Sequence, residues 1–324
     1  MLCINLESTD PFFNLAVDEY LLKNRTEDFL LLGVNDRSMI IGKHQVVHRE
    51  VDTRVVTEHN IPVIRRISGG GTVFHDNGNL NFSFIMKSEP GKQVDFRKYT
   101  LPVIEFLSSL GVDAKFEGKN DLKINGLKIS GNSEHIYRNR VLHHGTLLFN
   151  SDLDMLKDSV RSDAGKYKTR AVSSNPSPVI NLITVFKTVF KTVLKYGDDI
   201  HEFKSLMTMW FLKYFPGSET YTLSAEETKE VESLAWLKYR TWEWNYAYGP
   251  EYYFNNRFVF NGNEISCHLF VRDGLIKECE ISGSDEMEHT GKRLTGCRHM
   301  VNDIREVLEK ENILSRGFDV YNLF

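Results

Sequence analysis

Cysteine is scarce in this chain, and its spacing excludes the sites that cysteines usually build. Only four occur among 324 residues: Cys3, Cys267, Cys279 and Cys297. They form no CxxC pair, so a zinc site is not expected. Four cysteines in so long a chain do not make a disulfide framework either. We therefore expect reduced thiols in a cytoplasmic protein.

Segments that would carry the chain into or across a membrane are also missing. No run approaches the roughly 18 consecutive apolar residues of a membrane span, and residues 1–8 lack the charged start and apolar stretch of a signal peptide. Positive charge is not in excess, because the net charge is −4. Binding to nucleic acid irrespective of sequence needs a basic face. We expect neither a membrane nor a nucleic-acid partner.

The residues that are present are typical of a globular protein, with 41% hydrophobic and 26% charged side chains. Up to about residue 247, helical and strand patterns are mixed, which predicts an α/β (α+β) domain. The predicted helices cover 10–23, 101–110, 181–196, 201–214 and 225–239, and the predicted strands cover 29–34, 38–42, 80–86 and 142–149.

The last quarter of the chain has a different pattern of residues. Three apolar strands are predicted over 254–260, 264–271 and 275–281, separated by Asn261-Gly262 and Asp273-Gly274. These dipeptides are hairpin turn signals. A helix over 302–311 follows. Because a Gly-Pro pair at 249–250 interrupts regular structure, we predict a large domain over 1–247 and a small one over 252–324.

A glycine-rich segment runs from Arg65 to Asp76 and contains Gly69, Gly70 and Gly71. Consecutive glycines allow a backbone path closed to other residues and let bound groups reach main-chain N–H donors. Two arginines just upstream, Arg65 and Arg66, suit phosphate or carboxylate. The segment is not a P-loop, because no Gly-Lys-Ser/Thr follows. An anion-binding cradle and a flexible turn with surface arginines both fit.

A hairpin is predicted around Asn125-Gly126. That register pairs Ile124 with Leu127, Lys123 with Lys128 and Leu122 with Ile129. The second face then carries Asp121, Lys123, Lys128 and Ser130. Opposed lysines are unfavourable unless water or an anion separates them, and a nearby carboxylate can hold Mg²⁺. An ordinary solvent-facing hairpin surface is the alternative.

Two further segments carry candidate site residues. His143 and His144 point to opposite faces of their strand, so a shared metal is not expected and at most one lines a pocket. Residues 166–182 are basic, then rich in serine and proline, which predicts an irregular loop. Such a loop either closes on a nucleotide or is a solvated linker.

Taken together, these segments resemble the lipoate–protein ligase family. The family pattern Arg-Arg-x-Ser-Gly-Gly-Gly-(Ala/Thr)-Val-Phe-His-Asp is present over 65–76, Asn-Asp-Leu…Lys-(Ile/Val)-Ser-Gly over 120–131, and His-His-Gly-Thr-Leu-Leu over 143–148. The first-helix signature Leu-Ala-x-Asp-Glu matches 15–19, Trp-Glu-Trp-Asn stands at 242–245, and the tail Arg-Leu-Thr-Gly-Cys at 293–297 looks like the family's accessory domain. The resemblance covers nearly the whole chain.

This resemblance implies a fold related to biotin ligases and class II tRNA synthetases, with a mixed, mostly antiparallel sheet and a small C-terminal accessory domain. It implies ATP and Mg²⁺ as cofactors and lipoate as substrate, in two steps through lipoyl-AMP and pyrophosphate. The partner implied is an acceptor protein with a target lysine, a glycine cleavage H protein or the E2 lipoyl domain of a 2-oxoacid dehydrogenase. A monomer is the default expectation.

The resemblance also implies roles for particular residues. Lys128 matches the essential lysine that bridges the lipoate carboxylate and the α-phosphate, and Asp121 matches a Mg²⁺ anchor. The residues that match ATP ligands are Arg66, Gly71, Thr72, Val73, Phe74 and Lys128. Those that match lipoate ligands are Ser68, His75, Lys128 and His144. Lys168 and Asn181 bound the implied adenylate-binding loop. Gly33 or Val34 stands where some relatives have a pocket tryptophan.

Three alternatives share this fold. One is a biotin ligase, but its glycine-rich motif has arginines threaded through it rather than three adjacent glycines. A second is an octanoyl or lipoyl transferase that uses a cysteine nucleophile in the pocket and no ATP, but none of the four cysteines lies in or beside the motifs over 65–76, 120–131 and 143–148. The third is a non-catalytic binder of lipoyl domains, against which the intact set of Arg66, Asp121 and Lys128 argues.

Overall fold

The computed structural model describes residues 1–88, 94–190 and 199–324. Its centre is an eight-stranded sheet in the order β12-β1-β2-β6-β10-β9-β8-β7. The strands are β1 Leu2–Asn5, β2 Phe29–Val34, β6 Asn79–Lys87, β7 Lys115–Glu117, β8 Asp121–Ile124, β9 Leu127–Tyr137, β10 Arg140–Leu148 and β12 Glu219–Thr220. The pairs of β1 with β12 and with β2 are parallel, and the others are antiparallel. The predicted mixed, mostly antiparallel sheet is confirmed.

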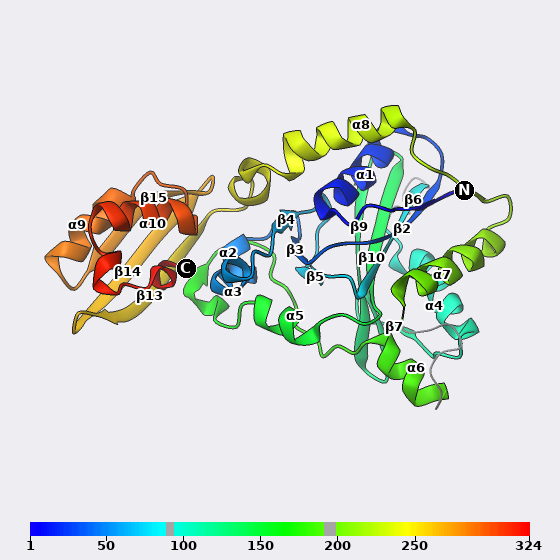
Figure 1. Ribbon diagram of the computed structural model, residues 1–324, viewed down its shortest axis with the longest axis horizontal. Coiled ribbons are helices and arrows are strands. Elements are labelled where there is room, and N and C mark those ends of the chain that lie inside the picture. The colour runs from blue at the N-terminus through cyan, green and yellow to red at the C-terminus, as the bar shows by residue number, and fades with distance from the viewer. Residues whose placement is uncertain (89–93, 191–198) are drawn as a thin grey trace.

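Helices cover both faces of this sheet (Figure 1). Helices α4 (Phe96–Ser109), α6 (Leu182–Phe190) and α7 (Ile200–Tyr214) bury one face in a core rich in phenylalanine. Helix α1 (Pro11–Asn24) lies on the opposite face and is covered in turn by α8 (Ala225–Leu234). Because α1 lies between a sheet and a helix, side chains on more than one of its faces are buried.

A smaller sheet lies beside the first, in the order β4-β3-β5. Its strands are β3 Ser38–Ile41, β4 Val63–Arg65 and β5 Val73–His75. Short helices α2 (Val47–Glu50), α3 (Thr53–Glu58) and α5 (Leu153–Ser159) surround it, and their apolar side chains form a separate small core with those of the strands. The glycine-rich segment connects β4 to β5, so this sheet positions it.

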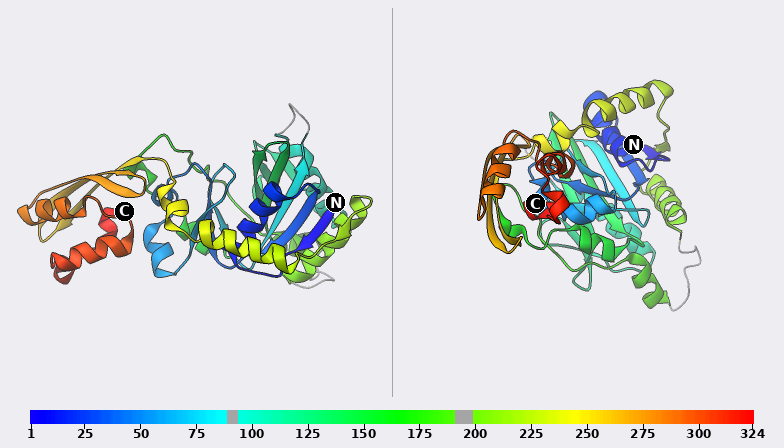
Figure 2. Two further views of the ribbon diagram at one scale, coloured as in Figure 1. Left: turned by 90° about the horizontal axis from the view of Figure 1, so that it is seen from above. Right: turned by 60° about the vertical axis from the view of Figure 1, so that its left-hand side comes forward.

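The C-terminal part has its own sheet and core at one end of the molecule (Figure 2). Strands β13 (Tyr252–Phe260), β14 (Asn263–Arg272) and β15 (Leu275–Ser282) form the predicted meander. Asn261, Gly262, Asp273 and Gly274 all have positive φ, as two-residue hairpin turns require. A fourth strand, β11 (Tyr167–Lys168), joins the sheet edge from the 166–182 loop. The boundary at 247–252 stays a prediction.

Several elements differ from the sequence prediction. Helix α4 begins at Phe96 rather than at 101, because Asp95 caps it by accepting from the N–H of Lys98 at 3.0 Å. Pro102 removes one N–H donor inside the helix without ending it. Helix α9 (Asp285–Leu294) was not predicted, and it precedes the predicted helix, α10 (Val301–Lys310). The end of the predicted 181–196 helix lies outside the described residues.

Buried histidines join the C-terminal part to α2. His299 Nδ1 lies 2.6 Å from the Tyr252 hydroxyl and its Nε2 lies 2.7 Å from the carbonyl of Leu323. His48 Nε2 lies 2.8 Å from the carbonyl oxygen of His299. Burial lowers the pKa of His299 to about 4 and the pKa of His48 well below its usual range. Both rings are therefore neutral at pH 7.

We expect the protein to lose stability as the pH falls from about 6.5 to about 4. In this window the unfolded chain binds protons at these histidines while the folded chain does not, so the free energy of unfolding decreases as the pH is lowered. For a native pKa of about 4, His299 alone accounts for roughly 2 kcal/mol at pH 5. Urea unfolding at pH 7 and pH 5 measures the difference. The exposed His289 gives the control, since we expect His289→Gln to leave the difference in unfolding free energy between pH 7 and pH 5 unchanged. Equal stability of the wild type at both pH values would contradict the prediction.

Candidate active site

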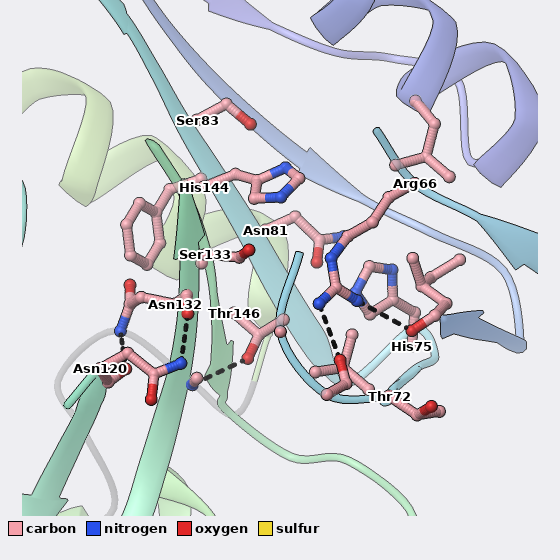
Figure 3. Close-up of a pocket in the computed structure, with 18 of the residues that line it drawn as sticks. Arg66, Thr72, His75, Asn81, Ser83, Asn120, Asn132, Ser133, His144 and Thr146 are labelled. Carbon is pink, nitrogen blue, oxygen red and sulfur yellow. Dashed lines mark hydrogen bonds between the residues drawn. The ribbon is translucent and has the colours of Figure 1, made fainter. Parts of the chain in front are cut away.

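A cavity of about 450 Å³ lies between the large sheet, the small sheet and α1. Its floor is the α1 side of β2, β6, β10 and β9, and its other walls are the glycine-rich turn, the β8–β9 hairpin and residues 172–175. Figure 3 shows Arg66, Thr72 and His75 on one side of the cavity and Asn120, Asn132 and Ser133 on the other. Segments far apart in sequence thus converge on one space.

Arg66 holds the glycine-rich turn in shape. Its guanidinium donates to Ser68 Oγ at 2.9 Å and to the carbonyls of Ile40 at 3.1 Å and Gly71 at 2.7 Å, and also to the carbonyl of Gly69. These bonds use four of its five N–H groups. Burial lowers the pKa of Arg66 to about 10, which still leaves it charged at pH 7. The cavity wall therefore carries a fixed positive charge.

Arg65 does not take part in the cavity, and the prediction of two anion-binding arginines is wrong in this respect. Its side chain is fully buried and donates to five carbonyl oxygens, those of Gly42, Lys43, Gln45, Trp244 and Asn245. Adjacent residues of an extended segment point to opposite sides, so only one arginine of the pair can face the cavity. Arg65 fastens the segment before α2 to the 243–247 turn.

The β8–β9 hairpin places Lys128 and Asp121 together in the cavity. Lys128 Nζ lies 2.8 Å from Asp121 Oδ1, and each side chain is about one-fifth exposed, at 22% and 20%. The turn has the positive φ angles expected of Asn125-Gly126. Lys123 stands opposite Lys128 as predicted but is drawn toward Glu117, with an N–O distance of 3.9 Å. The two lysines therefore have separate anionic partners.

Beyond Lys123 the predicted hairpin register is wrong by one residue. Leu122 pairs with Ser130 and Asp121 with Gly131, because a bulge lies between Leu122 and Lys123. A bulge adds one residue to one strand and re-aims its side chains. Here both Leu122 and Ile129 are fully buried in the core. Gly131 lies close to the Lys128 amine, because a Cβ at position 131 would be 3.1 Å from Nζ.

His143 and His144 lie on opposite faces of β10, as predicted. His143 is fully buried among aromatic rings, with Nδ1 2.9 Å from Glu134 Oε1, and burial lowers its pKa. His144 lines the cavity, with Nδ1 3.1 Å from Asp18 Oδ2 and Nε2 2.6 Å from Ser68 Oγ. His143 is thus a core residue, and His144 is the histidine that faces the cavity.

The 166–182 loop contributes residues 172–175 to the cavity wall. Ser174 Oγ accepts from the N–H of Thr72 at 2.8 Å and from Gln45 Nε2 at 3.1 Å, and it also bonds to Glu50. Further along, Lys128 N–H donates to the carbonyl of Pro178 at 2.8 Å. The loop is thereby fastened to the glycine-rich turn and to the lysine-bearing strand.

Most residues predicted for the site line this cavity: Arg66, Gly71, Thr72, Val73, His75, Asp121, Lys128 and His144. Phe74 does not, because its side chain points from β5 into the small core. Ser68 is fully buried behind the wall. Lys168 lies in β11 against Tyr253, and Asn181 bonds to the backbone of Ser151. Four predicted residues, Ser68, Phe74, Lys168 and Asn181, therefore have side chains outside the cavity wall.

The sequence prediction missed several lining residues. Asn81 and Ser83 lie on the floor, and the alternation of polar and apolar residues along β6 was the signal that could have identified them. Asp18 also lines the cavity and is 7% exposed. The wall near α1 also includes Asn14, whose Oδ1 has no hydrogen-bond partner in the described chain.

The described residues give little support for a metal centre, a membrane span or a catalytic thiol. Within residues 1–88, 94–190 and 199–324 no group of three or more His, Cys, Asp or Glu side chains could hold a metal ion. No helix in these ranges is long and apolar enough to cross a membrane. All four cysteines are free, and none lines the cavity. Burial raises the pKa of each thiol, that of Cys279 to about 12.

Comparisons with known proteins agree on one family. The model of the lipoyl protein ligase A/B catalytic domain matches residues 10–205. Lipoate–protein ligase 1 of Staphylococcus aureus is 36% identical over 99% of this chain and 94% of its own length. Lipoate-protein ligase LplJ of Bacillus subtilis is 34% identical over 95% of this chain and 93% of its own.

Solved structures give the same picture. Protein Ta0514 of T. acidophilum with bound lipoic acid has a TM-score of 0.62 at 27% identity, over 75% of this chain and 98% of its own. A bi-partite lipoate protein ligase of Thermoplasma acidophilum, studied with its E2 lipoyl domain, has a TM-score of 0.62 at 27% identity, over 75% of this chain and 95% of its own. A lipoate-protein ligase A bound with ATP has a TM-score of 0.61 at 27% identity, over 75% of this chain and 97% of its own. From the motifs, the fold and these matches, the chain belongs to the lipoyl protein ligase A/B catalytic domain family.

Proposed function

We propose that this protein is an ATP-dependent lipoate–protein ligase that forms lipoyl-AMP and transfers the lipoyl group to a lysine of an acceptor protein. The observation that carries the proposal is the placement of Lys128 and Arg66 in one cavity, beside a glycine-rich turn that is open to main-chain contacts. The family relatives named as lipoate-protein ligases support the same activity.

The first step needs two anions held in line. A lipoate carboxylate oxygen attacks the α-phosphorus of ATP, and the bond from that phosphorus to pyrophosphate breaks. The two anions repel each other, so fixed positive charge and positioning supply most of the rate enhancement. Lys128 bridges the carboxylate and the α-phosphate, and Arg66 contacts the nucleotide phosphates. Gly71, Thr72 and Val73 line the nucleotide with their backbone.

In the second step the ε-amine of the acceptor lysine attacks the lipoyl carbonyl. The C–O bond to AMP breaks, an amide forms, and the amine loses a proton to solvent. His75 and His144 line the acyl part of the cavity in this proposal. His75 Nδ1 accepts from Asn35 Nδ2 at 2.9 Å, and its pKa is lowered to about 3 by burial and by the charge of Arg66, so it is a neutral contact.

The residues present fit a Mg²⁺ ion that arrives with ATP. Mg²⁺ in nucleotide sites is held by one or two carboxylates, with phosphates and water completing the shell. Asp121 is the carboxylate that lines the cavity beside Lys128. When bound, the ion would neutralise phosphate charge; Asp121 would hold it, and Lys128 would then be free to turn toward the reacting carboxylate.

The acceptor in this proposal is a lipoyl-domain protein, either an E2 domain or a glycine cleavage H protein. A related ligase has been studied with its E2 lipoyl domain, which supports the first of these. Four free thiols are consistent with a reducing cytoplasm as the proposed location.

Intact-mass analysis of candidate acceptor domains tests the proposal. The purified protein is incubated with each acceptor and with lipoate, octanoate or biotin, in the presence and absence of ATP. We expect a lipoyl adduct on an E2 lipoyl domain or on H protein only with ATP. An adduct that forms without ATP, or with biotin alone, would contradict the proposal, and an acceptor with its target lysine replaced by arginine is the control.

Replacing all four cysteines tests the cysteine-dependent alternative. We expect a variant with alanine at the buried Cys3 and Cys267 and serine at Cys279 and Cys297 to transfer lipoate at nearly the wild-type rate, because no thiol lines the cavity. Transfer is measured by intact mass and folding by circular dichroism. Loss of transfer in a folded variant that still forms lipoyl-AMP would favour a thiol intermediate.

A further inference from the structure

Asp18 is a buried carboxylate to which none of the reaction steps above gives a role. It lies on α1, is 7% exposed and lines the cavity. Its Oδ2 accepts hydrogen bonds from His144 Nδ1 at 3.1 Å and from Ser83 Oγ at 3.2 Å. Burying a carboxylate costs free energy that hydrogen bonds only partly offset. The burial of Asp18 in the cavity wall therefore calls for an explanation.

A continuous chain of hydrogen bonds joins Asp18 to Arg66. After the contact between Asp18 and His144, His144 Nε2 lies 2.6 Å from Ser68 Oγ, and Ser68 Oγ lies 2.9 Å from Arg66 Nε. Ser68 is fully buried, so water does not compete for its hydroxyl. These hydrogen bonds thus connect a carboxylate at one end with a guanidinium at the other through an imidazole and a hydroxyl.

With a neutral imidazole at His144, the chemistry of the two ends fixes the direction of each proton in this series of hydrogen bonds. An ionised carboxylate only accepts, so in the neutral imidazole the proton lies on Nδ1 and Nε2 is an acceptor. The Ser68 hydroxyl then donates to Nε2, which leaves its oxygen to accept from Arg66. A guanidinium only donates, so the sequence of donors runs from Arg66 to Asp18 without a conflict. The opposite proton arrangement would leave Ser68 without an acceptor for its proton.

An Asp–His–Ser sequence of contacts is also the pattern of a nucleophilic triad, but the surroundings exclude that use here. Ser68 does not line the cavity, and its oxygen is already bonded to Arg66. A substrate carbonyl therefore has no access to the hydroxyl. The chain holds groups in place and does not supply a nucleophile.

We propose that Asp18 is a positioning residue for Arg66: by fixing the proton on His144 Nδ1 it orients Ser68, which in turn fixes the Arg66 guanidinium and the glycine-rich turn bonded to it. Arg66 donates to the carbonyls of Gly69 and Gly71, so its orientation is coupled to the shape of that turn. The significance of this for ATP rests on the proposed function, in which Arg66 and the turn bind the nucleotide.

Two substitutions of Asp18 test the inference. Asp18→Ala removes the acceptor, and Asp18→Asn keeps an oxygen acceptor without the charge. We expect the Kd for ATP, measured by calorimetry without lipoate, to rise about tenfold in Asp18→Ala and less in Asp18→Asn, because one charge-assisted hydrogen bond is lost or weakened. The exposed Asp113, paired with Lys115 at 3.0 Å, gives the control Asp113→Ala, with an unchanged Kd.

A second readout follows the proton itself. In protein labelled with ¹⁵N-histidine, with His144→Gln used for assignment, nitrogen shifts show which ring nitrogen of His144 carries the proton. We expect Nδ1–H in the wild type and in Asp18→Asn, and a mixture of tautomers in Asp18→Ala. A wild-type proton on Nε2, or an unchanged Kd for ATP in folded Asp18→Ala, would overturn the inference.

These readouts separate this inference from the proposed function. If the protein is not a lipoate ligase, the wild type forms no lipoyl-AMP. The tautomer of His144 still reports on the hydrogen bonds that join Asp18 to Arg66. If Asp18 only packs against the acyl group, Asp18→Ala raises the KM for lipoate and leaves the Kd for ATP unchanged.

Discussion

Replacing Lys128 with alanine is expected to reduce lipoate-dependent ATP–pyrophosphate exchange by at least about 100-fold, the loss that follows removal of one charge-stabilising donor. Lys128 lines the cavity and is held by Asp121 at 2.8 Å. Without its charge, the carboxylate and the α-phosphate repel each other with no compensation on that side of the cavity. Exchange of radiolabelled pyrophosphate into ATP, with and without lipoate, measures the step directly.

The same hairpin provides a matched control for this experiment. Lys123 stands directly opposite Lys128 and is equally exposed, at 22%, but it does not line the cavity. We expect Lys123→Ala to retain exchange within a factor of about two, as for a surface substitution worth less than about 0.5 kcal/mol. A folded Lys128→Ala protein with undiminished exchange would refute the proposed role of this lysine.

The second large effect is on stability and concerns Arg65. We expect Arg65→Lys to lower the free energy of unfolding by about 3 kcal/mol or more, since a buried acceptor left without a donor costs about 1–3 kcal/mol. The Arg65 guanidinium serves five carbonyl oxygens from two separate segments. A lysine ammonium has three donors on a flexible stem and cannot reproduce that fork. Urea unfolding monitored by fluorescence measures the change.

An exposed arginine gives the comparison for this substitution. Arg54 pairs with Asp319 and Glu58, and its side chain is 46% exposed. Exposed ion pairs contribute roughly 0–1 kcal/mol, so we expect Arg54→Lys to change stability by less than about 1 kcal/mol. If Arg65→Lys were no more destabilising than Arg54→Lys, the hydrogen bonds of Arg65 would not have the structural importance inferred here.

These two positions show how differently adjacent residues of one motif are used. The sequence presents Arg65 and Arg66 as equivalent cations beside three glycines. In the structure one is fully buried among carbonyls and the other lies on the cavity wall. The difference follows from the direction of each side chain along an extended segment, and a sequence pattern does not show which side will be the cavity.

Local signals in the sequence were sufficient for most of the longer helices and strands. Strand β2 was predicted with its observed bounds, and the turns at 261–262 and 273–274 have the backbone angles that Asn-Gly and Asp-Gly favour. Helix α9 was missed. The register beyond Lys123 was also wrong, because a bulge depends on how both strands pack against the core and leaves no local signature.

By itself, the sequence determined the family motifs, the mixed sheet and the cysteine-poor chemistry of this protein, because these depend on residue type and short spacing. It also showed that His143 and His144 must face opposite ways. The family resemblance implied His144 as the pocket histidine, and the structure places it in the cavity. Only the tertiary structure decided that Asp18 is joined to Arg66 and that Ser68, Phe74, Lys168 and Asn181 have side chains outside the cavity wall. Those outcomes depend on which elements pack together, and contacts between α1, β10 and the glycine-rich segment are set by the whole core rather than by any one segment.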